Sequence, residues 1–135
     1  SNLKKFIKHR NKIVDIYDRG LKDNPHLETL KKNKDYNYSI WKHVTLIKNK
    51  KISRLKLQKY LINNYNIYIN WAYDPPLHLQ PYFKNKYKIK NGYLKKTEIL
   101  MSRHFHLPLH PSISINDAKY ILNCLKKSLI RMKFE

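Results

Sequence analysis

Apolar residues recur every three or four positions from Leu3 to Leu21. On an α-helix this spacing gathers them on one side, the side that a helix of a globular protein turns to the core. Gly20 and Pro25 stand at the end of the stretch, where glycine permits a left-handed cap and proline disfavours helix in the residue before it. The pattern predicts a long first helix over residues 3–21.

Three later segments alternate between two faces, as strands do. In residues 39–47 apolar side chains occur on both faces, which is typical of a strand covered on both sides. Residues 67–71, Ile-Tyr-Ile-Asn-Trp, and residues 105–109, Phe-His-Leu-Pro-Leu, also alternate. Because Pro108 lacks a backbone N–H, the last of these strands is expected at the edge of a sheet.

Helical spacing returns between and after these segments. Ser53 is placed to cap a helix that runs to Asn64, and a short helix is expected over residues 94–101. Residues 114–117, Ser-Ile-Asn-Asp, have the form of a capping box, in which a serine side chain and an acidic side chain satisfy each other's backbone N–H groups. A last helix is predicted from there to Leu129.

The remaining stretches complete the order of elements. Residues 22–38 are polar and are expected to form no regular element, whereas residues 72–90 hold three of the six prolines and predict an ordered loop. The resulting order describes an α/β protein, specifically a two-layer sandwich. A length of 135 residues suits a single domain over residues 1–135, with a leading helix (3–21) and the sandwich (39–129).

Charge is the strongest compositional feature. Lys and Arg number 29 against 9 Asp and Glu, so the net charge is +20 and the pI is near 10.0. Such a charge attracts polyanions, and nucleic acid is the corresponding partner. The lysines are scattered, however, and far outnumber the arginines that base-reading sites prefer. Abundant Lys, Asn, Ile and Tyr are what A/T-rich codons favour, so compositional drift explains the charge better.

The sequence also bears on compartment. No run approaches the roughly 18 apolar residues that a bilayer-spanning helix needs. Cys124 is the single cysteine, which excludes an intrachain disulfide and a cysteine zinc cluster. We expect no membrane partner and a cytoplasmic location.

Two proline-containing segments carry the most specific signal. Residues 73–82 run Tyr-Asp-Pro-Pro-Leu-His-Leu-Gln-Pro-Tyr, and residues 107–111 run Leu-Pro-Leu-His-Pro. The first helix contains Arg10 ahead of its apolar run, and residues 40–43, Ile-Trp-Lys-His, give the first strand an aromatic centre. In order and approximate spacing these landmarks resemble the C-terminal small domain of the DegT/StrS family of pyridoxal-phosphate-dependent nucleotide-sugar aminotransferases. The resemblance covers nearly the whole chain.

The resemblance implies a small, mostly antiparallel sheet of about three strands packed by helices, as in the C-terminal domain of fold-type-I aminotransferases. It implies a homodimeric parent enzyme that moves an amino group from glutamate or a similar donor to a keto sugar carried on a nucleotide, with pyridoxal phosphate as electron sink. In the family, the cofactor and its Schiff-base lysine belong to a large N-terminal domain. This chain is therefore expected to hold no catalytic and no cofactor-binding residue and to be inactive alone.

The same resemblance implies that this domain forms one wall of the substrate cleft. Tyr73 and His78 are the candidate substrate-binding residues, because a Tyr hydroxyl and a His ring can hydrogen-bond to sugar hydroxyls or diphosphate oxygens. Alternatively, both side chains merely pin the loop through packing and a hydrogen bond. Family members often carry His where this chain has Ala72, so one side chain that would reach the substrate is missing.

Other functional readings are weaker. His104, His106 and His110, with His78, suggest a metal cluster, but no acidic residue lies near in sequence to orient the rings, so no metal site is expected. A function from another class stays open: an autonomous basic binding module, or a truncated gene remnant, that keeps this fold and binds polyanions such as nucleic acid.

Overall fold

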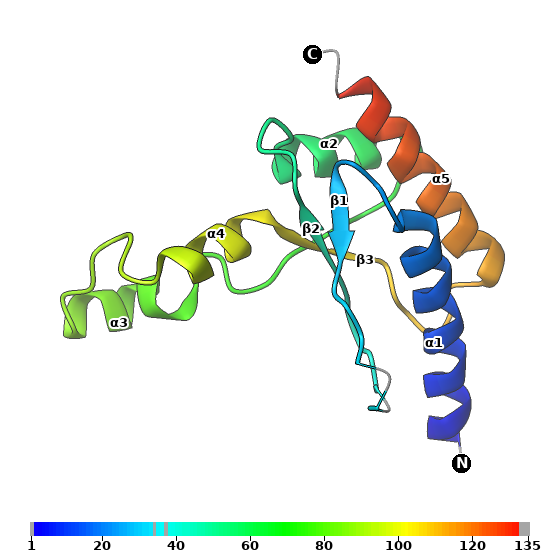
Figure 1. Ribbon diagram of the computed structural model, residues 1–135, viewed down its shortest axis with the longest axis horizontal. Helices are drawn as coiled ribbons and strands as arrows, with labels where there is room; N and C mark the ends of the chain where they lie inside the picture. The colour runs from blue at the N-terminus through cyan, green and yellow to red at the C-terminus, as the bar shows by residue number, and fades with distance from the viewer. Residues whose placement is uncertain (1, 34, 37, 133–135) are drawn as a thin grey trace.

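Five α-helices, one 3₁₀ turn and three strands are formed by residues 2–33, 35–36 and 38–132, which the computed structural model describes (Figure 1). In chain order they are α1 (Asn2–Leu21), β1 (Leu27–Thr29), β2 (His43–Ile47), α2 (Arg54–Tyr65), the 3₁₀ turn η1 (Leu77–Leu79), α3 (Pro81–Lys86), α4 (Lys95–Arg103), β3 (His104–Leu107) and α5 (Ile115–Arg131). None of the helices in this part of the chain is both long and apolar enough to cross a lipid bilayer.

The three strands form one antiparallel sheet in the order β1-β2-β3. Leu27 of β1 lies opposite Ile47 of β2, and His43 of β2 lies opposite Leu107 of β3. This arrangement confirms the predicted α/β sandwich with a small antiparallel sheet of three strands. Because β3 is an outer strand, Pro108 directly after it interrupts no further ladder.

The strand predicted over residues 67–71 is wrong. Only Asn70 pairs with β3, through an isolated bridge in which the His106 N–H donates to the Asn70 carbonyl at 2.6 Å. The Gln58 side-chain amide donates to the Ile69 carbonyl at 2.5 Å, so a side chain satisfies a group that a strand would pair in a ladder. Ile67 and Ile69 are buried all the same. The alternation of apolar and polar residues in this segment therefore reflects the packing of Ile67 and Ile69 into the core, and not pairing in the sheet.

Two other expectations for the sheet also need correction. Residues 22–38 were expected to lack regular structure, yet β1 forms there and the Asn24 side chain accepts hydrogen bonds from the backbone of His26 and Leu27 at its start. The strand expected over residues 39–47 begins at His43 and is covered on one face only, because its burial alternates between buried and half-buried positions.

Both predicted helix caps are confirmed. The Ser53 side chain accepts a hydrogen bond from the Lys56 N–H at 3.4 Å and so caps the first turn of α2. Ser114 and Asp117 form a reciprocal capping box at the start of α5, with bonds of 3.0 and 2.9 Å. These polar contacts satisfy backbone N–H groups that have no partner within the helix.

One buried cluster joins the sheet to α1, α2 and α5. Its largest fully buried side chains include Tyr17 of α1, Leu57 and Leu61 of α2, Phe105 of β3, and Leu125 and Leu129 of α5. Helices α1 and α5 lie side by side (Figure 1). Gly20 permits this close approach, because a methyl group at that position would overlap the Leu122 side chain of α5.

Residues 72–103, which we call the arm, leave the sandwich before β3 and carry η1, α3 and α4. Figure 1 shows α3 and α4 projecting from the sheet on the side away from α1 and α5. The structure describes every residue of the arm, and among them only Pro76 is buried. The loop expected over residues 72–90 is thus partly helical, and it makes little contribution to the core.

Candidate functional site

The face of the sheet that turns away from the buried cluster carries a hollow of about 390 Å³, which we call the sheet-face hollow. Strand pairing places Val44 opposite His106 and Leu46 opposite His104, so these four side chains form its floor. The other lining residues come from the arm and from the segment between β1 and β2; they are Leu30, Trp41, Lys42, Ala72, Tyr73, Leu100 and Met101. Mostly apolar walls with a few polar groups are typical of a binding surface.

The two histidines of the floor are neutral at neutral pH. His104 donates from Nδ1 to the Met101 carbonyl at 2.9 Å and accepts the Ala72 N–H at Nε2. His106 donates from Nδ1 to the Asn70 side-chain oxygen at 3.1 Å. Burial lowers the pKa of both rings, and with the nearby charge of Lys42 it lowers the pKa of His106 to about 4. A bound group therefore meets two uncharged imidazoles, already oriented by hydrogen bonds.

Tyr73 stands at the rim of this hollow. Its side chain is 70% exposed, and its backbone has a φ of 56°, in the left-handed region that a tyrosine seldom adopts. The unusual backbone turns the chain between Trp71 and the two prolines at 75 and 76. An exposed phenol beside an apolar hollow is free to donate to a substrate. The structure thus leaves the predicted role of Tyr73 open to experiment.

His78 lies elsewhere and is not among the residues that line the hollow. Its side chain is only 10% exposed, and its Nε2 lies 3.1 Å from Glu98 Oε1. This geometry corresponds to the alternative role, in which His78 pins the loop. Of the two predicted substrate residues, therefore, only Tyr73 lines the sheet-face hollow.

Glu98 of α4 organises the outer half of the arm. Besides pairing with His78, its carboxylate accepts the N–H groups of Gly92 at 2.8 Å and Leu94 at 3.2 Å. Gly92 has a φ of 88°, which glycine adopts without strain. The Gly92 and His78 hydrogen bonds hold the pKa of the Glu98 carboxyl below its ordinary value. Sequence reasoning did not single out Glu98, because its contact with His78 spans twenty positions and its bonds to Gly92 and Leu94 depend on the turn that precedes α4.

The arm is therefore expected to loosen in acid. A carboxyl whose pKa is lowered by folding stabilises the fold above its unfolded pKa, here 4.5, and loses that effect as the pH falls through the folded value. An NMR titration should show the Gly92 and Leu94 amides shifting below pH 4.5, while residues 121–131 of α5 stay unchanged. In Glu98→Gln, which keeps an acceptor but cannot titrate, the Gly92 shift should disappear. An unaltered Gly92 titration in that variant would assign the effect to another carboxyl.

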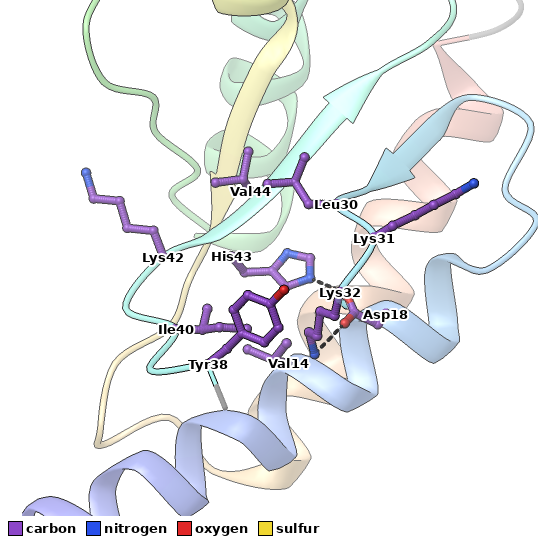
Figure 2. Close-up of a pocket in the computed structure, with 10 residues that line it drawn as sticks. All are labelled: Val14, Asp18, Leu30, Lys31, Lys32, Tyr38, Ile40, Lys42, His43 and Val44. Carbon is purple, nitrogen blue, oxygen red and sulfur yellow. Dashed lines mark hydrogen bonds and ion pairs between the residues drawn. The ribbon is translucent and has the colours of Figure 1, made fainter. Parts of the chain in front are cut away.

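A second hollow, of about 190 Å³, lies between α1 and the start of β2 (Figure 2). At its edge His43 Nε2 bonds to Asp18 Oδ1 at 2.9 Å, and Lys32 Nζ lies 2.8 Å from the other Asp18 oxygen. Burial alone would raise the pKa of Asp18, but the hydrogen bonds from His43 and Lys32 outweigh it and lower the pKa. Sequence reasoning missed this network, since its members lie on three separate segments.

The same network has the order of residues of a catalytic triad, but its hydroxyl group is not accessible to a substrate. Thr45 Oγ1 lies 3.2 Å from His43 Nδ1, so Asp18, His43 and Thr45 form a line of acid, base and hydroxyl. Thr45 is fully buried, and His43 is 3% exposed. A nucleophile must reach its substrate, and this hydroxyl cannot. The network therefore ties α1 to β2 and does no chemistry.

The two glycines, where the backbone could approach a phosphate most closely, do not form a cradle for pyridoxal phosphate. Gly20 lies within α1 against Leu122, and the Gly92 N–H is taken by Glu98, so neither glycine opens backbone N–H groups to a phosphate. Nor does any group of three His, Cys, Asp or Glu side chains within residues 2–33, 35–36 and 38–132 gather closely enough to hold a metal ion. Cys124 is buried in α5, where a thiol acts as a small apolar side chain.

Comparison with known proteins identifies the family. The model of the DegT/DnrJ/EryC1/StrS aminotransferase family matches residues 1–126. A curated but uncharacterised protein of Methanocaldococcus jannaschii is 25% identical over 123 residues, which are 89% of this chain and 31% of that protein.

Solved structures give the same answer for the fold. The aminotransferase TlmJ from Streptoalloteichus hindustanus superposes with a TM-score of 0.82 at 21% identity, over 96% of this chain and 33% of that one. Spr1654 from Streptococcus pneumoniae, in its PLP-form, gives a TM-score of 0.82 at 23% identity, over 93% of this chain and 32% of that one. The chain spans about a third of the length of these relatives. It belongs to the DegT/DnrJ/EryC1/StrS aminotransferase family.

Proposed function

We propose that this chain is the C-terminal part of a pyridoxal-phosphate-dependent aminotransferase that acts on nucleotide-linked keto sugars. The family match supports the aminotransferase class, and the spans of the relatives support a larger cofactor-binding domain as partner. In this proposal the parent enzyme is a cytoplasmic homodimer, and the chain is inactive alone. The observation that carries the substrate role is the exposed Tyr73 at the rim of an apolar hollow.

The chain's own residues act on the substrate side of the cleft. Pyridoxal phosphate, held by the larger domain, supplies the electron sink for amino transfer. Tyr73 donates its O–H to a sugar hydroxyl or a diphosphate oxygen. The apolar walls of the sheet-face hollow, among them Trp41 and Leu100, keep water from the bound sugar nucleotide. With Nε2 committed to Glu98, His78 has only Nδ1 left for a substrate, so its first role is to hold the loop.

At Ala72 the sheet-face hollow lacks an imidazole that family members often carry. Its N–H is bonded to His104 Nε2, and its methyl group lines the hollow. Where relatives carry His at this position, an imidazole would reach toward the substrate. The proposal therefore assigns more of the polar recognition to Tyr73 than in such relatives.

The Tyr73→Phe variant tests this proposal in the isolated chain. We expect UDP-N-acetylglucosamine to shift the NMR signals of residues 72–74 with a dissociation constant of about 1 mM or weaker, because one wall alone buries little of the ligand. Removing the hydroxyl should weaken binding about tenfold, the effect of one lost hydrogen bond of about 1.4 kcal/mol.

Tyr93→Phe is the matched control, because Tyr93 is an equally exposed tyrosine on the arm outside the hollow. Equal weakening in both variants, or equal binding of inorganic triphosphate by the wild type, would contradict the substrate role. The second outcome would instead support the basic polyanion-binding module, since charge alone would explain it. In the parent enzyme the Tyr73→Phe change should appear mainly as a higher KM for the sugar nucleotide.

A further inference from the structure

The orientation of the arm must be set at its base. No residue of η1, α3 or α4, all of which the structure describes, is buried in the core. Figure 1 shows α3 standing clear of the sandwich, whereas α4 approaches the sheet and contacts β2. A segment with so little packing has no broad interface to fix its direction, so the few contacts where it leaves and rejoins the sandwich decide where it points.

Arg54 makes those contacts at both ends of the arm. Its Nη1 donates to the carbonyl of Met101 at 2.6 Å and to the carbonyl of His104 at 3.2 Å, where the chain returns into β3. Its Nη2 pairs with the carboxylate of Asp74, where the chain leaves. Its guanidinium carbon lies 4.2 Å from the centre of the Trp71 ring, within the range of a cation–π contact.

The residue is itself firmly held. Arg54 is the first residue of α2, directly after the Ser53 cap, and α2 is anchored in the core by Leu57 and Leu61. The guanidinium is mostly enclosed, and burial lowers its pKa while the Asp74 carboxylate opposes this, yet an arginine stays protonated at any working pH. A planar fork of N–H donors is needed to reach carbonyls and a carboxylate at once, which a lysine ammonium does not offer.

We propose that Arg54 is a positioning residue that sets the direction of the arm and, through it, where Tyr73 and His78 stand relative to the sandwich. The arm-orienting role stands on the contacts of Arg54 alone. The consequence for substrate binding rests on the proposed function.

Residual dipolar couplings in the ¹⁵N-labelled chain test the arm-orienting role. In the wild type the couplings of α4 and α5 should fit one alignment tensor. In Arg54→Lys and Arg54→Met the couplings of α5 should stay, whereas those of α4 should leave the common fit or average toward zero. A general loss of stability would not produce this separation. Unchanged α4 couplings in both variants would overturn the proposal.

Two further variants make the result specific. Arg103→Lys is the matched control, because Arg103 lies at the end of α4 and has no hydrogen bond from its side chain among the described residues; its couplings should match the wild type. Asp74→Asn removes only the ion pair and should change the couplings of α4 less than Arg54→Lys does. This variant also provides a test if Arg54→Met does not fold. An Asp74→Asn shift larger than that of Arg54→Lys would contradict a role centred on Arg54.

The substrate consequence has its own readout. The dissociation constant of UDP-N-acetylglucosamine should rise severalfold in Arg54→Lys, since a displaced contact residue loses its geometry. If the α4 couplings change in the Arg54 variants but the wild type does not bind this probe, the proposed function is refuted and the positioning role remains.

Discussion

The Phe105→Ala variant is expected to lose about 3–5 kcal/mol of its free energy of unfolding. Phe105 is 0% exposed, lies on β3 opposite Thr45 of β2, and packs in the cluster that joins the sheet to three helices. Removing the ring leaves a cavity that the surrounding side chains fill only in part. Since domains of this kind are stable by about 5–15 kcal/mol in total, the loss should be evident in a urea unfolding curve followed by circular dichroism.

Phe6→Ala is the control for this prediction. Phe6 lies near the start of α1 and is 45% exposed, so its truncation should change the free energy of unfolding by less than about 1 kcal/mol. Similar midpoints for the two variants would show that β3 does not anchor the core. Because β3 also carries His104 and His106, the Phe105 variant should lose the sheet-face hollow along with its stability.

The second large effect is expected from Asp18→Leu. His43 is almost fully buried, and Asp18 accepts the hydrogen bond of its ring, so the substitution leaves a polar N–H without its partner. The cost should be about 2–3 kcal/mol at neutral pH, less than for a wholly enclosed pair because the Asp18 side chain is partly exposed. Urea unfolding at pH 7 measures it.

The pH dependence of this pair distinguishes its causes. Folding lowers the pKa of Asp18, so the ionised carboxyl stabilises the protein above its unfolded pKa of 3.8, and this part is lost as the pH falls through the folded value. The gap between wild type and Asp18→Leu should therefore narrow in acid. Asp18→Asn, which keeps an acceptor for His43 but carries no charge, should lie between the wild type and Asp18→Leu at pH 7. A loss as large as that of Asp18→Leu would mean that charge, and not the hydrogen bond, dominates.

Local signals in the sequence predicted the helices well. The apolar repeat from Leu3 to Leu21 and the Ser114 to Asp117 box both act within a few residues, and the structure confirms α1 and α5. The strands depended on partners elsewhere. Residues 67–71 have a strand's alternation, but the Gln58 side chain takes up the Ile69 carbonyl, and no local pattern announces that.

The candidate site could be predicted only in part, for the same reason. The segment 73–82 identified the family and its loop, which the family match confirms. It did not show that the His78 ring faces Glu98, twenty positions away, or that Arg54 reaches across to Asp74 and His104. These contacts depend on how the arm folds back on itself and on the sandwich.

The sparse burial of the arm has a consequence for how this protein can change. Apart from Pro76 and the residues that bind Arg54 or Glu98, substitutions within 72–103 touch little of the core and should cost little folding free energy. The sandwich, in contrast, resists change because its side chains are enclosed. The surface of the arm can therefore change quickly while heat tolerance depends on the sandwich, so the two parts evolve at separate rates within a single chain.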